Sequence, residues 1–137
     1  MTLIGKAVAH GAVTVINAIS CGFGAAIGVD LKTEAKVRLT DEPGIIKGRI
    51  LSDPGESPVL IEKVISHVMN HFSLKDKYGA SVETRSDIPI ARGLKSSSVA
   101  ANAIVLATFS ALSKEVDDLT VVNLGVDAAI DAKVTIT

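Results

Sequence analysis

A short segment in the second half of the chain places a glycine, two cations and three hydroxyls before an apolar run. Its sequence is Arg92-Gly93-Leu94-Lys95-Ser96-Ser97-Ser98, and the apolar residues that follow predict a buried helix over 96–112. The first four amides of a helix lack intrahelical partners, and the helix dipole adds about half a positive charge there. Because Gly93 lets the backbone approach an anion and both cations lie beside it, the segment predicts a phosphate-binding site.

The segment differs from the P-loop of nucleoside triphosphatases at one required position. That motif has a glycine five residues before the glycine at position 93, and here Ile88 occupies the position. The residues alone leave a second interpretation open, because serines before a helix often act only as N-terminal caps. The choice between a cap and a phosphate site therefore depends on the wider pattern.

The pattern Pro-x-x-x-Gly-Leu-x-Ser-Ser, which begins at Pro89, resembles the phosphate-binding motif of the GHMP kinases. This superfamily includes galactokinase and the homoserine, mevalonate and phosphomevalonate kinases. Lys95 replaces the usual third glycine of the motif, and residues 92–98 are more specifically similar to the archaeal-type shikimate kinases. The start of the chain, at 5–7, 10–19 and 22–31, is similar to the same branch, so the resemblance covers essentially the whole chain.

The resemblance implies transfer of a phosphoryl group from ATP, with Mg²⁺, to a hydroxyl of shikimate in aromatic amino acid biosynthesis. Ser97 would bind Mg²⁺, and Lys6 and Asn17 would face the substrate, although each could equally be a polar residue with a local hydrogen bond. The residues expected to bind ATP are Pro89, Ile90, Ala91, Arg92, Gly93, Leu94, Lys95, Ser96, Ser97, Ser98 and Val99. A kinase for another small alcohol such as homoserine, and a non-catalytic module that binds a nucleotide or a partner chain, remain alternatives.

The same resemblance implies that residues 1–137 are the N-terminal, ATP-binding domain of a longer kinase. Members of the superfamily place a catalytic Asp downstream of the phosphate loop, and residues 125–137 resemble the segment that leads to it. Asp127 and Asp131 are four residues apart on one helix face and are expected to be solvated. We therefore expect the catalytic Asp beyond Thr137, no C-terminal domain and no activity of the chain alone, with a complementary chain or self-association.

The elements that must position the phosphate loop are strands in the first half of the chain and helices in the second. The expected strands are residues 2–8, 11–19, 27–39, 47–51, 80–85 and 134–137. A turn at Ala9-His10-Gly11 is expected to join the first two strands as a hairpin. Two further helices are expected to begin at Pro58 and at Asp117 or Asp118. This order indicates an α+β fold, and the resemblance implies two layers, with a mostly antiparallel sheet packed on helices.

Composition excludes several classes of function. A net charge of −1 and only four aromatic residues make nucleic acid a poor partner. The uncharged stretch over 7–29 contains four glycines and several polar residues, which argues against a membrane span or signal peptide. The single Cys21 forms no internal disulfide and favours a cytoplasmic protein. His67 and His71 have the spacing of a zinc pair without a third ligand, so solvated side chains are expected.

Overall fold

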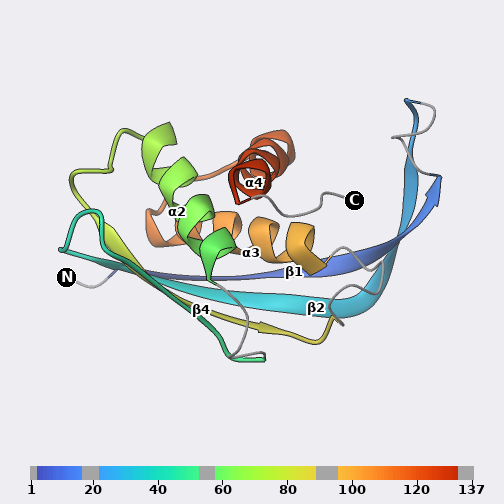
Figure 1. Cartoon of the computed structure of the whole chain (residues 1–137), viewed down its shortest axis with the longest axis horizontal. Coiled ribbons are helices and arrows are strands. Elements are labelled where there is room, and N and C mark those ends of the chain that lie inside the picture. The colour runs from blue at the N-terminus through green and yellow to red at the C-terminus, as the bar shows by residue number, and fades with distance from the viewer. Residues whose placement is uncertain (1–2, 17–21, 53–57, 89–95, 133–137) are drawn as a thin grey trace.

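The computed structural model describes residues 3–16, 22–52, 58–88 and 96–132. These residues form a sheet of four strands, β1 (Leu3–Ile16), β2 (Ala25–Thr40), β3 (Ile46–Ile50) and β4 (Gly79–Ser86). They also form three helices, α2 (Val59–His71), α3 (Ser96–Ala111) and α4 (Asp118–Asp131). All three helices lie on one side of the sheet and leave its other face open (Figure 1). The structure confirms the predicted α+β class and its mostly antiparallel sheet.

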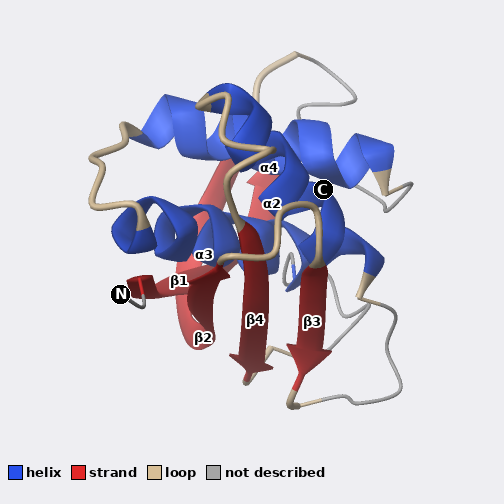
Figure 2. Ribbon diagram, turned by 90° about the vertical axis from the view of Figure 1, so that its left-hand side faces the viewer, coloured by secondary structure: helices blue, strands red, loops and turns tan. Residues whose placement is uncertain are grey.

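The strands are arranged in the order β1-β2-β4-β3. β2 pairs antiparallel with both β1 and β4, whereas β3 pairs parallel with β4. A parallel pair needs a crossover connection, and α2 lies within it (Figure 2). α3 packs directly on β1 and β2, while α4 packs mainly on α2 and α3 and forms an outer part of the helical layer.

The prediction of a hairpin within the first 19 residues is wrong. Residues 3–16 form the single strand β1, which pairs with β2 from Leu3 opposite Leu39 to Ile16 opposite Ala25. The pairing register shifts between His10 and Ala12, as in a β-bulge. The extra residues at this shift lie on β2, where residues 29–31 stand opposite Gly11 alone, so β1 continues through the Ala9-His10-Gly11 sequence that suggested a turn. His10 is accordingly an exposed strand residue and not a turn residue.

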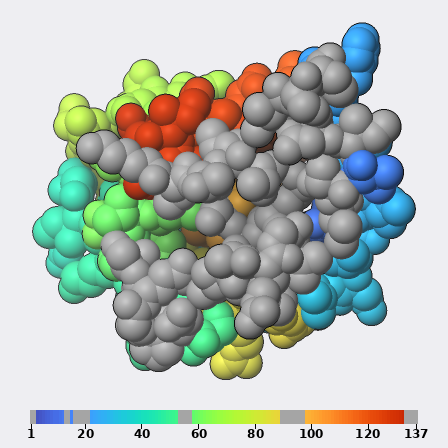
Figure 3. All heavy atoms as spheres, turned by 45° about the vertical axis from the view of Figure 1, so that its right-hand side comes forward, coloured from blue at the N-terminus to red at the C-terminus, as the bar shows by residue number. Residues whose placement is uncertain are grey.

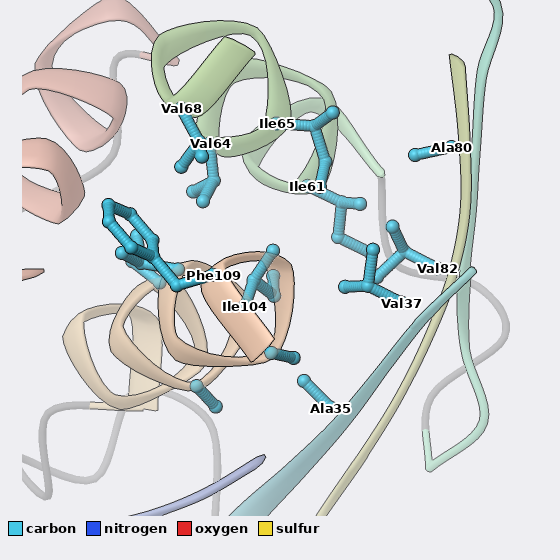
Figure 4. Packing of buried hydrophobic residues seen from close by; sticks show 14 of the residues in the cluster. Ala35, Val37, Ile61, Val64, Ile65, Val68, Ala80, Val82, Ile104 and Phe109 are labelled. Carbon is cyan, nitrogen blue, oxygen red and sulfur yellow. The ribbon is translucent and has the colours of Figure 1, made fainter. Parts of the chain in front are cut away.

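The core lies between the sheet and the helices, and Figure 4 shows how it is filled by small aliphatic side chains. Val37 from β2 and Val82 from β4 are fully buried and face Ile61 and Ile65 from α2. Ile104 from α3 is also fully buried in this cluster. Since α3 has buried residues on nearly every side, its position in the molecule is fixed by packing.

The predicted helix starts are confirmed for α2 and α4. Pro58 is the N-terminal cap residue of α2, and Asp117 caps α4 by accepting a hydrogen bond from the Thr120 amide at 3.4 Å. The Thr120 hydroxyl also donates to Asp117 and lowers the pKa of that carboxyl group. The contribution of this cap to stability is therefore present above the ordinary Asp pKa and is lost as the pH falls through the lowered one. No helix within the described residues is long and apolar enough to cross a membrane.

Gly5 is required where β1 crosses α3. A Cβ atom at this position would collide with the backbone oxygen of Ala107 and the backbone nitrogen of Ala111, neither of which can move independently of the helix. We expect Gly5→Val to lower the free energy of unfolding by at least about 3 kcal/mol. Gly28→Ala is the control, because a Cβ there meets nothing within 4 Å. Denaturant melts of both variants test this, and equal midpoints would contradict the packing described here.

Candidate functional site

The phosphate-binding segment predicted from the sequence falls only in part within the described structure. Pro89, Ile90, Ala91, Arg92, Gly93, Leu94 and Lys95 lie outside the described residues. Ser96 and Ser97 form the start of α3, although their side chains are not among the described atoms. Ser98 is half-buried and Val99 is buried, so the described end of the segment belongs to the first turn of α3.

The start of α3 has the electrostatic properties that an anion requires. The first turn contains no acidic side chain, so no carboxylate from this turn competes for the amides that lack intrahelical partners at a helix start. The helix has 16 residues and runs through the core, where a low dielectric strengthens the interaction of its dipole with a charge. The Ser98 hydroxyl lies in the same turn and offers a further donor. This donor set fits the phosphate groups of a nucleotide.

Hydrogen bonds fix the end of β4, from which the chain continues toward the predicted loop. The Ser86 hydroxyl lies 2.8 Å from the Thr33 hydroxyl, and it accepts a hydrogen bond from the Ile88 amide at 3.1 Å. The Asp87 amide donates to the Lys32 carbonyl at 2.9 Å, and the Ile88 side chain is buried. These bonds hold the entrance of the segment rigidly against β2. Sequence reasoning missed Thr33 and Ser86, because no local pattern links two residues 53 positions apart.

Of the two residues expected to face the substrate, only Lys6 is described, and it does not lie at the start of α3. Lys6 is exposed on the open face of the sheet, where it lies opposite Lys36 of β2. Its neighbour Gly5 faces α3, so Lys6 and α3 lie on opposite faces of β1. Asn17 lies outside the described residues, as do Cys21 and residues 134–137. The roles given to Lys6 and Asn17 remain predictions.

The histidines at positions 67 and 71 have separate surroundings. Nε2 of His67 lies 2.8 Å from Oδ2 of Asp131, a contact that joins α2 to the end of α4. The sequence indicated that Asp131 is a solvated carboxylate, whereas the structure shows that it also contacts His67. His71 packs edge-on against Phe72, with ring centroids 4.9 Å apart. Within the described part of the chain, no group of three or more His, Cys, Asp and Glu side chains could hold a metal ion.

Comparison with known families gives one match that covers more than half of the chain. Residues 59–136 match the model of the GHMP kinases N terminal domain. The matched region contains α2, β4, α3 and α4, and therefore includes the start of α3 and the segment before it.

Two curated relatives are similar to this chain along nearly all of its length. A protein named shikimate kinase from Methanococcoides burtonii is 51% identical over 137 residues, which are 100% of this chain and 47% of the relative. A shikimate kinase from Methanothrix thermoacetophila is 49% identical over 133 residues, which are 97% of this chain and 44% of the relative. The chain thus spans about half the length of the curated relatives that it matches.

Solved structures with the same fold are more distant in sequence. A crystal structure of mevalonate kinase superposes with a TM-score of 0.77 at 17% identity, covering 96% of this chain and 47% of that chain. A structure described as MDDEF in complex with MVAPP, AMPPCP and magnesium gives a TM-score of 0.73 at 19% identity, covering 94% of this chain and 43% of that chain. At these identities the superpositions establish the shared fold.

Proposed function

We propose, on the premise that the chain belongs to the family of GHMP kinase N-terminal domains, that it is the ATP-binding part of a shikimate kinase. The observation that carries the proposal is 51% identity over the whole chain with a protein of that name. Such a kinase transfers a phosphoryl group to a hydroxyl of shikimate and gives shikimate 3-phosphate. Homoserine kinase also shares the fold, at 21% identity and a TM-score of 0.73, so another small alcohol is the alternative acceptor.

The residues proposed to hold ATP are those at the start of α3 and in the segment before it. The free amides of the first turn and the Ser98 hydroxyl would donate hydrogen bonds to phosphate oxygens. Arg92 and Lys95 would add two positive charges, and Gly93 would let the backbone approach the phosphates. The absence of an acidic residue from the first turn of α3 supports this assignment.

A magnesium ion is proposed to accompany ATP, with Ser97 as the ligand from this chain. Mg²⁺ in kinases is held by phosphate oxygens and water with only one or two protein ligands, so a cluster of three side chains is not required. A hydroxyl at the start of a helix that also binds phosphates would place the ion beside those phosphates. The structure described as a complex with AMPPCP and magnesium is consistent with this fold holding both.

In phosphoryl transfer the protein mainly positions its ligands and neutralises developing charge. ATP supplies the phosphoryl group that is transferred. The part proposed for this chain is to orient the phosphates through a rigid α3 and to stabilise their charge through its amides, Arg92 and Lys95. A carboxylate that orients the acceptor hydroxyl is expected outside residues 1–137.

We expect the 137-residue chain alone to bind MgATP and to transfer no phosphoryl group to shikimate. The complete kinase, which continues this chain to the length of its relatives, should be active because it supplies the missing carboxylate. Isothermal titration with MgATP and a coupled assay for ADP release test both parts in the two proteins. Turnover of shikimate by the chain alone, or lack of nucleotide binding by both proteins, would contradict the proposal.

The cytoplasmic location expected from the sequence belongs to the same proposal, since a reduced thiol at Cys21 and the use of ATP both suit that compartment.

A further inference from the structure

The open face of the sheet is strongly basic. Side chains alternate along each strand, and those on this face point away from the helices. Among the residues paired across the four strands, this face carries seven cations and two carboxylates, which are Lys6, Lys32, Lys36, Arg38, Lys47, Arg49, Arg85, Glu34 and Glu83; Asp30 of β2 is also exposed, at the register shift. The whole chain has a net charge of −1, so the remaining residues must carry six net negative charges to balance the five net positive charges here. The molecule is therefore electrically polarised.

The cations of the open sheet face are available to a partner. Lys32 is paired with Glu34 at 3.5 Å, and none of the other six cations forms an ion pair with a described residue. Two exposed aliphatic side chains, Ile4 and Val8, lie between the charges on β1, with 48% and 45% of their surface accessible. A groove of about 550 Å³ crosses the face between β1 and β4. The face thus combines free positive charge with apolar surface.

The outer side of α4 has the opposite character. Leu119, Val122 and Ile130 are exposed at helical spacing, with 67%, 46% and 60% of their surface accessible. Asp127 and Asp131 are exposed on an adjoining stripe of the helix, and α4 contains no Lys or Arg. Figure 1 shows α4 on the far side of the helical layer from the sheet, and Figure 3 shows part of it, in red, at the molecular surface. Asp131 is in contact with His67 of α2, and apart from that contact the outer face of α4 is an acidic and apolar helix surface without an ion pair to any described residue.

We propose that the open sheet face of one copy of this chain binds the outer face of α4 from a second copy. The two surfaces carry opposite charges, and both also expose aliphatic side chains. They also agree in size, because the 14 residues of α4 span about 21 Å and the cations from Lys32 to Arg38 on β2 span about 20 Å. A nucleic acid would satisfy the cations and would leave Ile4 and Val8 uncovered, so a protein helix is the better match.

The geometry sets the form of the assembly. The two surfaces lie on opposite sides of the molecule, so each copy can bind one neighbour through its sheet and another through its helix. Two open sheet faces repel each other, which excludes a symmetric pair formed through that surface. A contact between one helix and one sheet face is small and belongs to the weak class of interfaces. Association should therefore be concentration-dependent, head-to-tail and sensitive to salt.

Sedimentation velocity on variants with altered surface charge tests the proposal. The sheet variant is Lys36→Glu with Arg38→Glu, and the helix variant is Asn123→Lys with Asp127→Lys; all four side chains are exposed. The unmodified chain should form species larger than dimers as its concentration rises to about 1 mM at low salt, and about 0.5 M salt should reverse this. Each variant alone should remain a monomer. An equimolar mixture should form mixed dimers again, because the unmodified helix of the sheet variant fits the unmodified sheet face of the helix variant.

The control is Lys63→Glu with Lys75→Glu, which makes the same change in charge as the sheet variant but lies on neither surface. This control should associate as the unmodified chain does. A mixture of the sheet and helix variants that stays monomeric would overturn the proposal, as would association of the sheet variant alone at the unmodified strength. Formation of the mixed dimer would also prove that both variants are folded. The proposal would also be contradicted if the unmodified chain stayed monomeric at low salt.

Discussion

Gly93→Val is expected to abolish binding of ATP to the chain. The proposed site needs close approach of the phosphates to the backbone before α3, and a β-branched side chain would occupy that space. Valine also disfavours the positive φ values that such loops often require. We expect calorimetry to show at least about a 100-fold weaker affinity for MgATP, which corresponds to about 2.7 kcal/mol.

Gly28→Ala is the matched control for this experiment, because a side chain there meets no other atom within 4 Å. Circular dichroism should show that both variants are folded. An unchanged nucleotide affinity in folded Gly93→Val would remove this loop from the mechanism and would leave the serines as helix caps.

Ser97→Ala is expected to lower the turnover of the complete kinase by about 100-fold or more, because a lost metal ligand weakens the stabilisation of charge in the transition state. A serine that served only as a cap would behave in the opposite way. Its replacement would cost about 1 kcal/mol of stability and leave turnover nearly unchanged. Thermal melting and single-turnover kinetics on the same variant separate the two roles.

Ser110→Ala provides the comparison for that measurement, since Ser110 is exposed near the other end of α3. It should change neither turnover nor stability by a large factor. Full activity of Ser97→Ala in the presence of Mg²⁺ would show that the hydroxyl at position 97 does not bind the metal.

The helices and most of the strands could be predicted from the sequence because their signals are local. Pro58 and Asp117 marked the starts of α2 and α4, and the apolar run after Ser98 gave α3 to within one residue of its observed end. The length of β1 could not be predicted in this way. The sequence around Gly11 has the composition of a turn, and only the pairing of β1 with β2 on both sides of Gly11 shows that the strand continues.

The surroundings of the candidate site could not be predicted, because they consist of contacts between residues that are far apart in the sequence. The motif at 89–99 was visible in the sequence, whereas the hydrogen bond between Thr33 and Ser86 that fixes its entrance was not. The contact between His67 and Asp131 was missed for the same reason, because 64 residues separate them. The opposite charges of the open sheet face and α4 also required the fold, since a net charge of −1 conceals them.

Phosphoryl transfer by the complete kinase is the most direct test of the proposed function. The enzyme would be given ATP, Mg²⁺ and, in separate reactions, shikimate, homoserine, mevalonate or galactose, and the phosphorylated product would be measured. We predict that shikimate is phosphorylated with a kcat/KM at least about 100-fold above that of the other alcohols, a difference of about 2.7 kcal/mol in transition-state binding. Phosphorylation of homoserine in preference to shikimate, or of none of the four alcohols, would contradict the assignment.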